Sequence, residues 1–165
     1  RVARRADGGG FVIGVTDQAR DRRHGPLDGS VTGEGRLVLL PVGAWDLRAT
    51  VALQVARAMP AEERRALHVA SAAGGWTTLG AHWQGESVSL PLQVIDAEGR
   101  SVADTVAAVV ADELMRFCEI AVIVGRLDVT RWRHRLLHDR TADDICRRLA
   151  DMSHTTVSCV NVGTV

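Results

Sequence analysis

Two stretches of this chain are apolar without interruption, and they limit the possible fold more than any other feature of the sequence. Residues 37–42 are Leu-Val-Leu-Leu-Pro-Val, and residues 120–125 are Ile-Ala-Val-Ile-Val-Gly. A strand with one face in water alternates apolar and polar side chains, whereas a strand covered on both faces is apolar throughout. Both runs are also too short for helices of ordinary length. They therefore predict two central strands of a parallel sheet that carries helices on both faces.

The rest of residues 36–165 alternates between strand and helix patterns. Further strands are expected at residues 66–70, 87–95 and 156–162, and helices at about 47–59, 77–83, 101–117 and 141–150. Pro91 indicates that the strand at 87–95 lies at an edge, because proline cannot donate a hydrogen bond to a neighbouring strand. The alternation predicts an α/β fold with right-handed crossovers. We expect a five-stranded parallel sheet with helices on both faces and, counting strands from residue 36, the order 3-2-1-4-5.

Residues 1–35 differ from the rest of the chain. They contain eight glycines and the arginines Arg1, Arg4 and Arg5, and they lack a periodic apolar pattern. This composition predicts a linker or tail over residues 1–35 that precedes a domain over residues 36–165. The apolar triplet at residues 11–13 is the exception, since it could dock onto the domain or add an edge strand.

The composition excludes several classes of function. Twenty arginines balance twenty acidic residues, so no basic surface for nucleic acid is indicated. The chain has no lysine, which excludes a phosphate-loop lysine or a Schiff-base lysine. Its three cysteines form no CxxC pair and sit among apolar neighbours, so they are interpreted as core thiols in a reducing compartment. No apolar run approaches the ~20 residues that span a bilayer.

The predicted strand order places one candidate site. In open α/β sheets ligands bind outside the carboxyl ends of the strands, where the strand order reverses. Here that point lies between the segment after Val42, which carries Gly43 and Asp46, and the segment from Gly125 to Thr141.

The second of these segments is rich in arginine, histidine and tryptophan. Guanidinium groups such as that of Arg131 suit phosphate or carboxylate, and Trp132 offers a stacking face. A helix that begins at Thr141 would add its positive dipole end. We therefore expect an anionic nucleotide, although a solvated basic loop or a contact with an acidic partner is the open alternative. The predicted ligand-binding residues are Gly43, Asp46, Gly125, Arg131, His138 and Thr141.

Catalysis and metal binding have weaker support in the sequence. No serine has a nucleophile-elbow motif around it. His134 and His138 stand four residues apart, as two metal ligands on a helix can, but this spacing alone is unspecific. We expect neither a catalytic residue nor a metal site. A small enzyme with His134 or His138 as general base is the third-ranked hypothesis.

In layout the chain resembles the universal stress proteins, which bind ATP through a glycine pattern after the fourth strand. Gly125 stands at the matching strand end and Thr141 at the matching helix start, but the middle glycine of the pattern is missing. The acid that this family carries at the end of the first strand falls on Gly43, with Asp46 nearby. The resemblance implies the universal-stress-protein fold with a degenerate nucleotide pocket.

A narrower resemblance rests on residues 131–142, RWRHRLLHDRTA, and on residues 39–48, LLPVGAWDLR. Both segments resemble the C-terminal cytoplasmic domains of bacterial amino acid–polyamine–organocation permeases. This resemblance implies a non-catalytic regulatory or accessory domain of an amino acid permease, at the cytoplasmic face of the cell membrane.

Several expectations about partners follow from this resemblance. The membrane contact would be made only by a preceding transmembrane part, and arginine-rich cytoplasmic flanks agree with Arg1, Arg4 and Arg5. No cofactor is expected, and the ligand would be an adenine nucleotide or a cyclic dinucleotide. Dimerisation through the last strand is left open. The alternative is a free-standing cytoplasmic universal stress protein that binds ATP.

Overall fold

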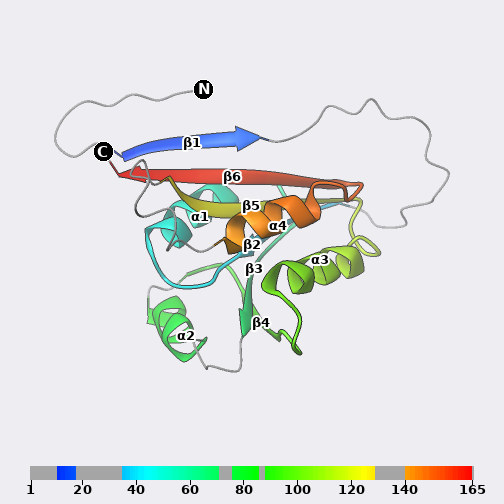
Figure 1. Cartoon of the computed structure of the whole chain (residues 1–165), viewed down its shortest axis with the longest axis horizontal. Coiled ribbons are helices and arrows are strands. Elements are labelled where there is room, and N and C mark those ends of the chain that lie inside the picture. The colour runs from blue at the N-terminus through cyan, green and yellow to red at the C-terminus, as the bar shows by residue number, and fades with distance from the viewer. Residues whose placement is uncertain (1–10, 18–34, 71–75, 86–87, 129–139, 165) are drawn as a thin grey trace.

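A six-stranded sheet lies at the centre of the chain, with two helices against each face (Figure 1). The computed structural model describes residues 11–17, 35–70, 76–85, 88–128 and 140–164. The elements in chain order are β1 (Phe11–Asp17), β2 (Arg36–Pro41), α1 (Leu47–Ala58), β3 (Glu63–Ala70), α2 (Trp76–Gly85), β4 (Leu92–Asp96), α3 (Val102–Glu113), β5 (Glu119–Asp128), α4 (Thr141–Leu149) and β6 (Thr155–Thr164).

The strand order of the sheet is β1-β6-β5-β2-β3-β4. The five strands from β6 to β4 are all parallel, so the predicted order 3-2-1-4-5 is confirmed. The predicted edge position of the third strand is also confirmed, because β4 pairs with β3 at the end of the sheet. β4 is shorter than expected and begins after Pro91, whereas α2 is longer than the short helix predicted at 77–83.

The sixth strand comes from the segment that the sequence marks as a linker or tail. β1 pairs antiparallel with β6, from Phe11 opposite Thr164 to Asp17 opposite Ser158 (Figure 1). The apolar triplet at residues 11–13 therefore forms part of an added edge strand, which was one of the two alternatives that the sequence allowed. Residues 1–10 and 18–34 lie outside the described residues, and the domain boundary at residue 36 stays a prediction.

Alternating side chains of the central strands divide the core into two clusters. On β2, Leu37 and Leu39 belong to the cluster covered by α3 and α4. Val38 and Leu40 belong to the cluster covered by α1 and α2. β5 alternates in the same way, and all these β2 side chains are buried. The uninterrupted apolar runs are thus explained by a sheet with no free face at its centre.

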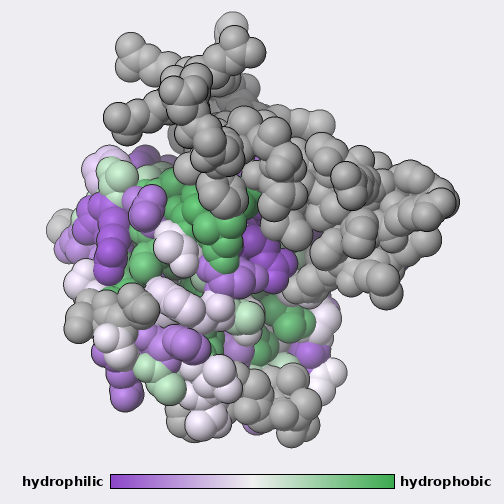
Figure 2. Space-filling model, turned by 90° about the vertical axis from the view of Figure 1, so that its left-hand side faces the viewer, coloured by the Kyte–Doolittle hydropathy of each residue, from purple (hydrophilic) through white to green (hydrophobic). Residues whose placement is uncertain are grey.

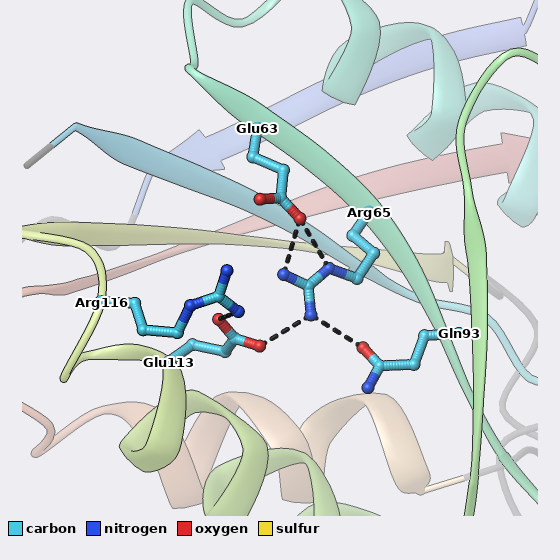
Figure 3. A network of polar contacts seen from close by, with 5 residues as sticks. All are labelled: Glu63, Arg65, Gln93, Glu113 and Arg116. Carbon is cyan, nitrogen blue, oxygen red and sulfur yellow. Dashed lines mark hydrogen bonds and ion pairs between the residues drawn. The ribbon is translucent and has the colours of Figure 1, made fainter.

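A network of polar and charged side chains lies at the amino-terminal ends of β3 and β4 and joins them to the end of α3 (Figure 3). The guanidinium of Arg65 donates to Glu63 at 2.6 Å, to Gln93 at 3.0 Å and to Glu113 at 2.7 Å. Glu113 is the last residue of α3 and is buried, and Arg116 donates to its second oxygen at 3.2 Å. A buried carboxylate at a helix carboxyl end is costly unless it is paired. By pairing with Glu113, Arg65 therefore stabilises the packing of α3 against the sheet.

We predict that Arg65→Leu lowers the free energy of unfolding by about 3–5 kcal/mol, because it leaves Glu113 buried without its main partner. Denaturant unfolding measures the change. Arg100→Leu is the matched control, since Arg100 pairs with Glu98 in solvent, and it should change stability by less than about 1 kcal/mol. Equal effects of the two substitutions would show that the network adds nothing beyond a surface ion pair.

Candidate functional site

A cavity of about 350 Å³ lies at the carboxyl ends of β2, β3 and β5. The amino-terminal ends of α1, α3 and α4 also line it, so three helix starts meet at this edge of the sheet. Figure 2 looks onto this edge and shows apolar residues (green) reaching the surface between polar ones. The larger apolar side chains of the wall are those of Val42, Leu67, Val69, Val102, Val106, Val124 and Ile145. This is the point where the strand order reverses, as the sequence predicts for a ligand site.

Asp46 and Arg48 form a charged pair in the cavity wall. One carboxylate oxygen of Asp46 accepts the backbone N–H of Ala49 at 3.0 Å and caps α1. The other oxygen accepts from the guanidinium of Arg48, at 2.7 Å from Nε and 2.6 Å from the terminal nitrogen. Asp46 is therefore held in place by α1 and orients a guanidinium beside the cavity. Arg48 was not predicted from the sequence.

His68 is a second residue that the sequence pattern did not single out. It lines the cavity, is buried, and its Nδ1 lies 2.8 Å from the backbone oxygen of Val42. A carbonyl oxygen can only accept, so Nδ1 carries a proton. In the neutral imidazole Nε2 is then the hydrogen-bond acceptor of the ring. The one available signal was a polar residue inside the apolar strand segment 66–70.

Thr141 begins α4 and lines the cavity together with Ala142. Thr141 already has an interaction partner. The residue before the helix, Arg140, makes no side-chain capping bond, so the start of α4 is not closed by its own N-cap. Asp143 of the first turn is paired with Arg126 at 2.6 Å. The positive dipole end of α4 therefore points to the cavity with its nearest acid neutralised.

The two predicted glycines differ in what surrounds them. A side-chain carbon at Gly43 would meet nothing within 4 Å. A side-chain carbon at Gly125 would lie 2.9 Å from the backbone oxygen of Arg48. Gly43 thus leaves space at the cavity, whereas Gly125 also allows α1 to approach β5 closely.

Four predicted site residues, Gly43, Asp46, Gly125 and Thr141, line the same cavity. The other two, Arg131 and His138, lie outside the described residues, as do Trp132 and His134. The assignment of all six as ligand-binding residues stays a prediction.

Other candidate sites have less support in the described part of the chain. No group of three or more histidine, cysteine or acidic side chains could hold a metal there. A second hollow is lined by Arg57, Arg64, Ser89 and Leu90. Both of its guanidiniums already have acceptors, because Arg57 lies 3.4 Å from the Ser89 hydroxyl and Arg64 donates to a backbone oxygen at 2.6 Å. The described helices include none that is both long and apolar enough to span a bilayer.

We predict that Gly125→Ala lowers the free energy of unfolding by about 1–3 kcal/mol, because the added methyl group forces α1 away from β5. Thermal or denaturant unfolding checks this value. Gly43→Ala is the matched control and should change stability by less than about 0.5 kcal/mol. A neutral Gly125→Ala variant would contradict the close approach of α1.

Comparison with known families adds a separate finding. Residues 34–162 match the family model of the KimA potassium transporter C-terminal domain, which covers β2 through nearly all of β6. No curated protein matches the chain. The expectation of a transporter's C-terminal domain is confirmed. The finer expectation of an amino acid permease is not supported, because the matching family is described as a domain of a potassium transporter.

Proposed function

Because the chain belongs to the KimA potassium transporter C-terminal domain family, we propose that it is the cytosolic regulatory domain of a potassium transporter. We also propose that it binds a nucleotide in the cavity at the carboxyl edge of the sheet. The observation that carries the proposal is the cavity itself, where apolar walls meet the starts of three helices.

The size and walls of the cavity suit a nucleoside. Ligand sites for small molecules have volumes of about 300–1,000 Å³ and apolar walls with a few polar groups. At about 350 Å³ this cavity is at the lower end, which favours a mononucleotide or one half of a cyclic dinucleotide. Val42 after β2 and the lining valines of β3, α3 and β5 offer apolar contacts for a base.

The polar groups of the cavity supply the two kinds of contact that a nucleotide needs. Nε2 of His68, which carries no hydrogen in this tautomer, can accept an N–H of a base, such as the amino group of adenine. The amino-terminal ends of α1 and α4, together with Arg48, favour the negative charge of a phosphate. A phosphate would compete with Asp46 for the guanidinium of Arg48, so we expect modest affinity.

A regulatory role fits these residues better than catalysis. The described wall of the cavity contains no serine, cysteine or glutamate. Its aspartate caps α1, and its histidine is fixed by a backbone oxygen. The contacts of Asp46 and His68 are thus structural ones, which suits groups that bind and orient a ligand. The family match favours a transporter domain over the free-standing stress protein that was the alternative.

We predict that calorimetric titration detects binding of AMP, ATP or a cyclic dinucleotide, and that Gly43→Val weakens it at least about tenfold. The valine side chain enters open space at the cavity, so it competes with the ligand without disturbing the fold. Thr141→Val should weaken binding of phosphate-bearing ligands and leave adenosine unaffected.

Gly85→Val is the matched control for Gly43→Val. A side-chain carbon at Gly85 would also meet nothing within 4 Å, and this exposed residue lies at the end of α2, away from the cavity. The control variant should bind like the unmodified chain. Nucleotide binding that survives Gly43→Val would place the ligand elsewhere. No binding at millimolar concentration would leave an interaction module without a nucleotide ligand.

A further inference from the structure

Two of the three cysteines face each other inside the domain. Cys146 on α4 and Cys159 on β6 are buried, and their sulfur atoms lie 2.8 Å apart. A covalent disulfide bond is about 2.05 Å long, so the sulfurs need to move less than an ångström to bond. The third cysteine, Cys118, is exposed and its thiol donates to the backbone oxygen of Gly35 at 2.9 Å. The prediction of core thiols is confirmed for Cys146 and Cys159 and is wrong for Cys118.

The surroundings of the pair shift the pKa values of the two thiols in opposite directions. The hydrogen bond from Cys146 and, next, the positive charge of Arg126 lower the pKa of Cys159 to about 7, against the effect of burial. The same hydrogen bond and burial raise the pKa of Cys146. Asp143, which is paired with Arg126 at 2.6 Å, acts in the opposite direction on Cys159. Cys159 is thus the more acidic thiol of the pair, and Cys146 is the less acidic one.

We propose that Cys146 and Cys159 form a site of reversible oxidation, which a hydroperoxide converts to a disulfide between α4 and β6. The Cys159 thiolate attacks one oxygen of hydrogen peroxide and the O–O bond breaks. Hydroxide is the leaving group, and Cys159 becomes a sulfenic acid. The sulfur of Cys146 then attacks the sulfur of Cys159. The S–O bond breaks, the proton of Cys146 goes to the leaving oxygen, and one water is released. The two sulfurs together lose two electrons, and the peroxide gains them.

The position of the pair ties it to the wall of the cavity. Cys146 follows Ile145 on α4, and Cys159 lies beside Val124 of β5 in the sheet register. Both Ile145 and Val124 line the cavity. A disulfide would therefore fix the helix whose first residue is Thr141 to the sheet beneath it. The proposal does not depend on the identity of any ligand.

The test treats the full 165-residue chain with hydrogen peroxide, then denatures it and labels the remaining thiols with a maleimide. The reduced chain has three thiols, and the oxidised chain should retain one, at Cys118. A non-reducing digest should contain the peptide of Cys146 linked to that of Cys159, and dithiothreitol should release it. Retention of both buried thiols, or a link that involves Cys118, would overturn the proposal.

Variants separate this site from the exposed thiol. Cys118→Ala should still form the internal disulfide, whereas Cys146→Ala should not, because Cys159 then has no thiol within bonding reach. In the Cys118→Ala background, oxidation should raise the midpoint of thermal unfolding by several degrees, because the cross-link restricts the unfolded chain. If Cys146→Ala fails to fold, the linked peptide from Cys118→Ala decides the question alone. An unchanged midpoint with no linked peptide would contradict the proposal.

Discussion

The structure depends on the burial of β2 and β5 on both faces. Leu37, Val38, Ile120 and Val122 have no exposed surface, so helices must cover the sheet from two sides. Parallel strands with helices on both faces need crossovers, and the crossovers on either side of β2 leave in opposite directions. Because the crossovers diverge, a gap remains at the carboxyl ends of β2 and β5. The same constraint that makes the core therefore also makes the cavity.

The two ends of the sheet are used differently. At the amino-terminal ends of β3 and β4, Arg65 and Glu113 form a saturated network, and no buried side-chain nitrogen or oxygen of the described residues lacks a partner. At the carboxyl ends, His68 lines an apolar cavity with Nδ1 held by a backbone oxygen, and the helix starts bring a positive potential. The ion pairs at the amino-terminal ends thus stabilise the fold, whereas the positive helix ends at the carboxyl ends can attract an anionic ligand.

Much of the fold could be predicted because the pattern that encodes it is local. The apolar runs identify β2 and β5, and the alternation of strand and helix patterns predicts the strand order. Asp46 and Ser101, which cap α1 and α3, are residue types that favour this position. The cavity position followed from this order, and Gly43 and Thr141 were found with it.

The remaining features depend on contacts between distant segments. β1 is a strand because β6 offers it an open edge, and nothing within residues 11–17 requires this partner. The contact of Cys146 with Cys159 and that of Arg65 with Glu113 join separate elements without a sequence motif. The kind of transporter was also not encoded in a local motif, and the family match does not support the amino acid permease that the resemblance implied. Arg131 and His138 lie outside the described residues.

The central claim is that the carboxyl edge of the sheet is a nucleotide site, and amide chemical-shift mapping of the full chain with AMP or ATP tests where a ligand sits. We expect the largest shift changes at Gly43, Gly125 and Ala142, which line the cavity, and none at Arg65 and Gln93 at the opposite edge. Changes that cluster at the amino-terminal edge, or no change at millimolar nucleotide, would contradict the account.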